Sequence, residues 1–109
     1  MQACLFYLTA QGVFCFRINA GMVAMPGVNG GRRRVVRLAP AGCPDILGLY
    51  QTLSAGIGRM IGVECKMPGR KSTPVQLEFQ RMIRLCGGAA AEVHSVHELA
   101  DWWKSEIDC

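Results

Sequence analysis

Residues 62–69 have the sequence GVECKMPG, and the fold and chemistry of this 109-residue chain are best inferred from them. The apolar residues before and within this stretch predict a strand that ends at the Pro-Gly turn signal. Side chains alternate along a strand, so Glu64 and Lys66 lie on one face and Val63 and Cys65 on the other. Alone, such a charged pair is typical of a solvent-facing strand surface.

A second apolar run precedes it, in the sequence PDILGLYQTL of residues 44–53. Its spacing fits a helix with Asp45 as the N-cap, but it also fits a strand. A glycine inside the run and the loop SAGIG favour a strand that forms a hairpin with residues 59–66. In an antiparallel hairpin the start of one strand lies beside the end of the other, so Asp45, Glu64 and Lys66 would meet at one sheet edge.

Two carboxylates held that close repel each other unless a cation lies between them. Hard oxygen ligands suit Mg²⁺ or Mn²⁺. A lysine beside the ion can orient an attacking water. The three residues therefore indicate metal-assisted phosphodiester hydrolysis.

These residues also carry a family resemblance. The segments GCPD and GVECKMPGRKSTPVQ, preceded by FRINAGM, resemble the virus-type replication-repair nuclease domain (VRR-NUC), a branch of the PD-(D/E)xK nuclease superfamily. The resemblance runs from about Leu5 to Val96. It implies an α/β fold with a restriction-endonuclease-like αβββαβ core, and dimers for stand-alone members. The site residues that it implies are Asp45 and Glu64 as metal ligands, the Cys65 backbone carbonyl as a third ligand, Lys66 as the catalytic lysine, and Gln76 near the active site.

One feature departs from the family pattern. Family members carry a glutamate at the start of the first helix, a place that falls at or before Met1 here, where the nearest polar residue is Gln2. The departure keeps open an alternative function, a catalytically impaired nucleic-acid-binding module of the same fold. The resemblance also places Asn19 and Gly21 in a loop near the active site.

The chain is basic, with a formal net charge of +4 and a pI of about 8.9. A polyanionic partner is consistent with this charge. Five basic residues in two clusters are candidate phosphate contacts, and the alternative is that they only solvate loops. These residues are Arg32, Arg33, Arg34, Arg70 and Lys71. The residues His94 and His97 are assigned to surface or capping roles rather than to a metal site.

The remaining sequence predicts a small mixed sheet flanked by helices, with an extra C-terminal helix, in one domain over residues 1–109. Residues 2–11 are expected to be helical, 13–19 extended, and 21–34 a glycine-rich connection with an Asn-Gly turn. The other expected elements are a short strand in RVVRLAP, a helix in STPVQLEFQRMIRLCGG, a strand in AAAEVHS, and a last helix capped by Ser95 and Glu98 that runs through Trp102 and Trp103.

The helix in STPVQLEFQRMIRLCGG has clear start and stop signals. Thr73 is a good N-cap, Pro74 fits the first helical position, and Gly87-Gly88 ends the helix. Thr73 and Gln76 also form a capping-box pattern, which competes with an active-site role for Gln76. The predicted buried stripe consists of Val75, Phe79, Met82 and Cys86.

Cysteine usage and the N-terminal sequence bear on location. The six cysteines show no zinc spacing and are interpreted as buried thiols in a reducing compartment. The segment MQACLFYLTAQG lacks a basic leader and a cleavage site, and no apolar run is long enough to span a bilayer. We therefore expect a soluble, cytoplasmic protein of a bacterial or phage-infected cell.

These features together predict a Mg²⁺- or Mn²⁺-dependent DNA endonuclease that acts on branched DNA such as four-way junctions. Two-fold-related active sites would match a junction's own symmetry, so we expect a homodimer. Trp102 and Trp103 point about 100° apart on a helix, so one of them is a candidate interface residue. The rival hypotheses are the impaired binding module and a purely structural domain.

Overall fold

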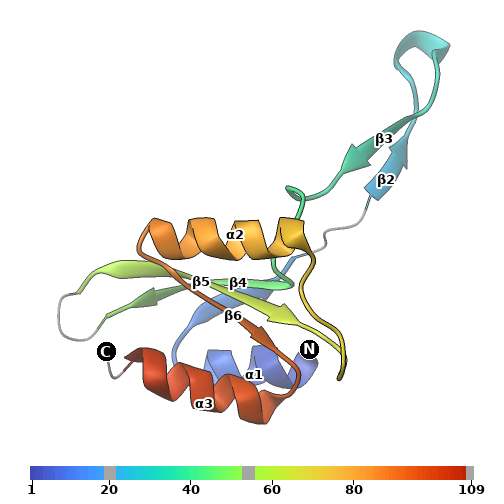
Figure 1. The fold of residues 1–109 in the computed structure, drawn as a ribbon. Coiled ribbons are helices and arrows are strands. Elements are labelled where there is room, and N and C mark those ends of the chain that lie inside the picture. Colours follow the sequence, from blue (N-terminus) through green and yellow to red (C-terminus); the bar gives the residue numbers. More distant parts are fainter. Residues whose placement is uncertain (19–21, 53–55, 108–109) are drawn as a thin grey trace.

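A four-stranded mixed sheet forms the body of the protein in the computed structural model, which describes residues 1–18, 22–52 and 56–107 (Figure 1). The strand order is β1-β4-β5-β6, in which β5 and β6 are parallel and the other pairs antiparallel. The four strands are β1 (Phe14–Arg17), β4 (Ile46–Gln51), β5 (Gly58–Cys65) and β6 (Ala89–Val93). The expected small mixed sheet flanked by helices is confirmed.

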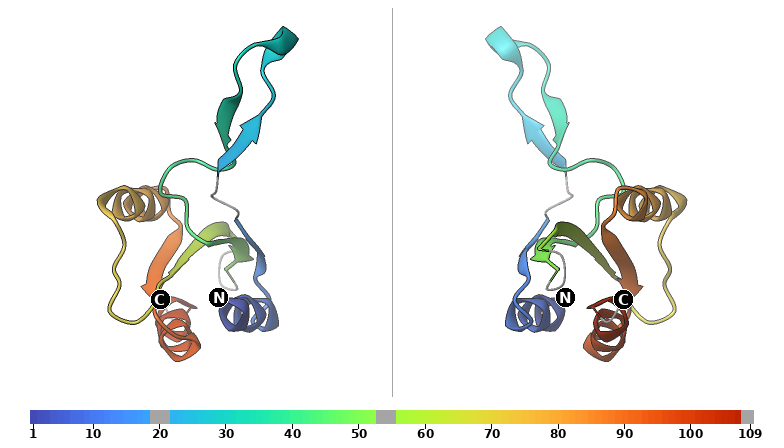
Figure 2. Two further views of the ribbon diagram at one scale, coloured as in Figure 1. Left: turned by 90° about the vertical axis from the view of Figure 1, so that its right-hand side faces the viewer. Right: turned by 90° about the vertical axis from the view of Figure 1, so that its left-hand side faces the viewer.

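Helices cover both faces of this sheet (Figures 1 and 2). The helices are α1 (Gln2–Ala10), α2 (Pro74–Leu85) and α3 (Val96–Ile107). Helices α1 and α3 lie on one face, where the core is built from apolar side chains of both helices and the alternate strand residues. The residues of this core are Cys4, Leu8, Val13, Ile46, Ile61, Val63, Ala89, Ala91, Val93, Leu99 and Trp103.

The β4–β5 hairpin follows the predicted pairing, which resolves the ambiguity of residues 44–53 in favour of a strand. Ile46 pairs with Val63, so Asp45 lies directly beside Glu64 where β4 begins. The chain then crosses over through α2 and adds β6 parallel to β5, with Glu92 opposite Glu64. Three acidic residues therefore lie at the same end of the sheet.

Helix α2 begins as predicted, but it is rotated away from the predicted orientation. Thr73 and Gln76 form the reciprocal capping box. The residues that face the sheet are Gln80 and Ile83, whereas Val75 and Met82 are largely exposed and Cys86 is also exposed. The predicted buried stripe is therefore wrong. The rotation turns Gln76 towards Glu64 on β5 and Gln80 towards Ser72 in the loop before the helix, and those hydrogen bonds outweigh the apolar spacing.

Residues 22–38 differ most from the sequence-based expectation. They were expected to be a connection that ends in one strand, but they form a hairpin of two strands, β2 (Met22–Met25) and β3 (Arg34–Arg37). The strands β2 and β3 pair only with each other among the described strands. This hairpin, which we call the arm, projects away from the body (Figure 1).

The predicted Asn-Gly turn is confirmed at the tip of the arm, within the short 3-10 turn η1 (Val28–Gly30). Asn29 and Gly30 both have positive φ, at 55° and 77°, which is the combination of a type I′ hairpin turn. A Cβ added to Gly27 would lie 2.3 Å from the Arg32 carbonyl oxygen, so only glycine fits where the two strands of the tip meet.

One part of the sheet is left uncovered. Helix α2 packs over β5 and β6, and the β1–β4 side of the same face has no helix over it (Figure 2). The register places five apolar side chains on this open area, Phe14, Phe16, Leu47, Leu49 and Met60. Phe14 is 70% exposed and Leu49 56% exposed. This apolar area lies beside the exposed side of α2.

Both tryptophans pack against the core, and the predicted interface role of one of them stays a prediction. Trp103 is 2% exposed and stacks edge-on against Tyr50 at 4.8 Å between ring centroids. Trp102 is half-buried and packs against the same core.

Of the helices in the described ranges, none has the length and apolar character needed to cross a membrane.

Candidate active site

Two carboxylates meet at the end of the β4–β5 hairpin. The amide N–H of Cys65 donates to Oδ2 of Asp45 at 2.9 Å, which ties the start of β4 to the end of β5. Gly42 supports the turn before Asp45. Its φ is +79°, and a Cβ there would lie 2.4 Å from the Val75 carbonyl oxygen. The turn and the first turn of α2 therefore fix the position of Asp45.

The second carboxylate, that of Glu64, is buried at 2% exposure. Burial, the neighbouring negative charge of Asp45 and the proton that the two carboxyl groups can share raise the pKa of Glu64 to about 8, although Lys66 lowers it. Within the described residues, Oε2 of Glu64 is the buried side-chain oxygen that has no hydrogen-bond partner. A buried carboxylate oxygen without a partner is costly, and a cation would relieve both this cost and the repulsion from Asp45. The two carboxylates therefore fit a divalent ion.

Gln76 combines the two roles that the sequence left in competition. Its side-chain Oε1 accepts from the Thr73 N–H at 2.8 Å, which completes the capping box. Its Nε2 donates to Oε1 of Glu64 at 3.2 Å. The cap thus orients the amide towards the carboxylate. As a result, Oε1 of Glu64 is held by protein while Oε2 is left for another partner.

Lys66 lies one position after β5, and its backbone N–H donates to the Val93 carbonyl at 2.9 Å. Its side chain is half-buried, and its charge acts on Glu64 and on Glu92. The structure therefore brings together Asp45, Glu64, Lys66 and Gln76. Cys65 was expected to contribute its backbone carbonyl as a metal ligand. The contact that the structure shows is made by its amide N–H, which donates to the Asp45 side chain.

Sequence reasoning missed a polar chain behind this cluster. Ser72 donates its N–H to Oε1 of Glu92, and the buried Gln80 donates Nε2 to Ser72 Oγ at 3.0 Å. The Ser72 hydrogen bonds, followed by the charges of His94 and Lys66, lower the pKa of Glu92. This series of hydrogen bonds fixes the loop that follows Lys66. The available signal was an acidic residue inside an otherwise apolar strand.

His94 ties the same loop to α3. Its Nε2 lies 2.7 Å from the Arg70 carbonyl oxygen, and its Nδ1 lies 3.1 Å from Oε2 of Glu98. Both partners are acceptors, so the imidazolium satisfies both. The hydrogen bond to Arg70 and then the Glu98 carboxylate raise the pKa of His94. The predicted capping box is only half formed. Ser95 Oγ accepts the backbone N–H of Glu98, but the Glu98 side chain accepts the backbone N–H of His94 rather than that of Ser95.

The predicted phosphate contacts fall into two places. Arg70 and Lys71 are exposed in the loop after Lys66, beside the carboxylates in sequence. Arg32, Arg33 and Arg34 are exposed on the arm, away from the carboxylates (Figure 1). Asn19 and Gly21 lie outside the described residues. In the ranges 1–18, 22–52 and 56–107, no group of three or more His, Cys, Asp or Glu is placed to hold a metal ion.

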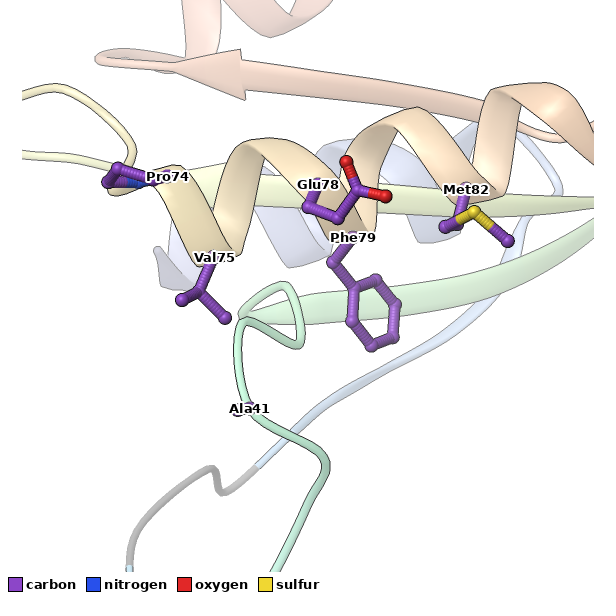
Figure 3. Close-up of a pocket in the computed structure, with 6 residues that line it drawn as sticks. All are labelled: Ala41, Pro74, Val75, Glu78, Phe79 and Met82. Carbon is purple, nitrogen blue, oxygen red and sulfur yellow. The ribbon is translucent and has the colours of Figure 1, made fainter.

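A separate pocket lies along the exposed side of α2 (Figure 3). It is mainly apolar and contains none of the predicted site residues. Its lining consists of Ala41, Pro74, Val75, Glu78, Phe79 and Met82. The exposed apolar stripe of α2 forms one wall, so the pocket belongs to the uncovered apolar surface rather than to the carboxylate cluster.

No family model and no curated protein matches this chain.

Proposed function

We propose that the protein is a metal-dependent DNA endonuclease that hydrolyses phosphodiester bonds. The observation that carries this proposal is the buried Glu64 carboxylate beside Asp45, whose Oε2 has no partner in the described residues. The element order α1-β1-β4-β5-α2-β6 in the body supports the αβββαβ core of a restriction-endonuclease-like fold. The resemblance of the segments GCPD and GVECKMPGRKSTPVQ to VRR-NUC domains also supports the proposal.

Asp45 and Glu64 would hold Mg²⁺ or Mn²⁺, with waters in the remaining positions. The ion neutralises charge that develops on the phosphate during hydrolysis. Gln76 keeps Oε1 of Glu64 in place, and the Cys65 amide orients Asp45. Lys66 would position the attacking water by hydrogen bonding. The water gives up a proton as its oxygen bonds to phosphorus, the bond from phosphorus to the sugar oxygen breaks, and that oxygen takes up one proton, so that no net proton is consumed.

The alternative is a nucleic-acid-binding module without chemistry. Among the described residues, no third His, Cys, Asp or Glu joins Asp45 and Glu64 in a group that could hold a metal ion. Such a module would bind DNA with the same dependence on salt, and it would cut nothing in the presence of the metal.

A homodimer is part of the proposal, and the surface that supports it differs from the tryptophan pair. The stripe of α2 that the sequence marked as buried is exposed, and it lies beside the open β1–β4 area. Extended apolar surface of this kind is unusual on a monomer. A second copy of the chain would bury it and place two active sites on one branched DNA, four-way junctions being the first candidate.

The test is a cleavage assay on a panel of four-way junctions, nicked duplexes and single strands, with Mg²⁺, with Mn²⁺, and with a chelator. The proposal expects cuts only with the ion, and most of them in the branched substrates. Gel shifts without cuts in any lane would favour the binding module. Neither shifts nor cuts would favour a structural domain.

A further inference from the structure

The arm carries the whole net charge of the protein. Residues 22–38 contain 4 of the 12 basic residues and no acid, which leaves 8 basic residues elsewhere to balance the 8 acidic ones. The formal charge of +4 is therefore located on this hairpin. Three of its arginines, Arg32 to Arg34, are exposed at and beside the tip. A concentrated cationic charge on a projecting element is a footprint for a polyanion.

The arm also has the shape of a specific reading element. The strands β2 and β3 form a two-stranded antiparallel ribbon, closed by a tight turn at Asn29 and Gly30. Val28 is exposed at the tip, and Val35 is exposed directly after Arg34. A two-stranded ribbon fits the major groove of B-form DNA, where apolar side chains contact thymine methyl groups and arginines reach guanine or phosphate.

The base of the arm lies next to the candidate active site. The N–H of Ile18, one residue after β1, donates to the Asp45 carbonyl oxygen at 2.7 Å. On the other side, residues 38–44 lead directly from β3 to Asp45. Both stems of the arm therefore leave the body beside Asp45. A duplex held by the arm would therefore be held near the carboxylates.

The dimensions set how much duplex the protein covers. The molecule is 55 Å in its longest dimension. At 3.4 Å per base pair this equals about 16 base pairs, so the arm and the body can contact one duplex at separate points. An RNA duplex offers no equivalent site, because the major groove of A-form RNA is deep and narrow.

We propose that the arm inserts into the major groove of double-stranded DNA and anchors the duplex arm of the substrate next to Asp45 and Glu64. The inference rests on the proposed nuclease function, for which it names the substrate class as B-form duplex rather than single-stranded DNA or double-stranded RNA. The arginines at the tip hold the arm on the duplex, and without them the fit of the ribbon to the groove no longer contributes to binding.

The experiment measures binding in chelator, so that no cleavage occurs. Fluorescence anisotropy is recorded for the full-length protein with a labelled 20-base-pair DNA duplex, an RNA duplex of the same sequence, and a single strand. The test variant is Arg32→Ala, Arg33→Ala, Arg34→Ala combined. The charge-conserving control replaces the same three residues by lysine, and Lys104→Ala on α3 is the control for charge removal on the body.

The wild type is expected to bind the DNA duplex at least tenfold more tightly than the other two at about 0.1 M salt, and the triple alanine variant to lose that preference. Removing three phosphate contacts should lower the slope of log K against log salt by about 2.7. The triple lysine variant and Lys104→Ala should retain the preference. Dimethyl sulfate should find guanine N7, a major-groove atom, protected by the wild type and not by the triple alanine variant.

Equal affinity for the RNA duplex, unprotected N7 atoms, or wild-type binding by the triple alanine variant would each overturn the proposal. Binding to none of the three nucleic acids would overturn it in favour of an acidic protein partner. The two proposals fail separately. Protection of N7 without cleavage in Mg²⁺ would contradict the proposed nuclease activity and support groove binding by the arm. Cleavage together with wild-type binding by the triple alanine variant would contradict groove binding by the arm and support the nuclease activity.

Discussion

Glu64 shows how a single buried side chain links folding to the proposed chemistry. In the absence of an ion its carboxylate is buried beside Asp45, and its pKa of about 8 lies well above the usual range. The folded protein therefore holds a proton that the unfolded chain releases at lower pH. An ion would take the place of this proton, so stability and metal binding should respond to the same substitution.

The first prediction concerns Glu64→Gln in chelator. The folded pKa is raised, so the contribution of the protonated carboxyl is fully present below the unfolded pKa of about 4.5 and is lost as pH rises towards 8. In that window Glu64 should lower the free energy of unfolding of the wild type by up to about 1.4 kcal/mol per pH unit. The free energy of unfolding of Glu64→Gln, measured by urea titration from pH 5 to 9, should lack this decline.

The same variant tests the ion. Mn²⁺ should raise the melting temperature of the wild type and leave that of Glu64→Gln unchanged. Glu78→Gln, an exposed acid on α2, is the control and should respond like the wild type. An equal rise in Glu64→Gln would place the ion elsewhere.

At the residue scale, the sequence predicted the cluster of Asp45, Glu64 and Lys66 because strand alternation and hairpin pairing are local rules, whereas Gln76 was placed there only by the family resemblance. It could not predict the hydrogen bond from the Cys65 amide to the Asp45 side chain, or the one from the Ser72 amide to Glu92. No periodicity encodes either contact, and the second depends on the path of the loop after Lys66.

At the scale of elements, α2 shows the limit of pattern-based prediction. The capping signals of Thr73 and Pro74 are local, and they are confirmed. The facing side of the helix was predicted from apolar spacing and is wrong, because Gln76 and Gln80 find partners in Glu64 and Ser72. The hairpin β2–β3 was missed for a related reason, since the strand residues whose burial is described, Ala24, Met25 and 34–36, are all exposed and leave no alternating pattern.

The second prediction concerns the contact between His94 and the loop after Lys66. The pKa of His94 is raised, so the stabilisation is fully present below about pH 6.5 and is lost as pH rises through the folded value. Hydrogen exchange of the backbone amides near Arg70 should therefore become faster, relative to intrinsic rates, between pH 6 and 8.

His94→Gln should show fast exchange near Arg70 already at pH 6. His97→Gln, an exposed neighbour that shares none of these contacts, is the matched control and should follow the wild type. Protection near Arg70 that does not change with pH in the wild type would contradict the role given to the imidazolium.

At the scale of the whole molecule, the uncovered apolar surface predicts a dimer. Met82→Glu on the exposed stripe of α2 places a charge in the proposed interface and should shift sedimentation at micromolar concentration from dimer to monomer. Leu77→Glu, an exposed leucine on another side of the same helix, should leave the dimer intact. A wild-type monomer, or equal dissociation by both variants, would contradict the proposed surface.

The most direct test of the central claim, metal-dependent hydrolysis by this carboxylate–lysine cluster, is single-turnover cleavage with Lys66→Ala. The variant is compared with the wild type and with Lys71→Ala, at saturating protein on the best substrate of the panel. The account predicts cuts by the wild type and Lys71→Ala only with Mg²⁺ or Mn²⁺, and a rate at least about 100-fold lower in Lys66→Ala with nearly unchanged affinity. Cleavage by Lys66→Ala at the wild-type rate, or no cleavage by the wild type with either ion, would contradict it.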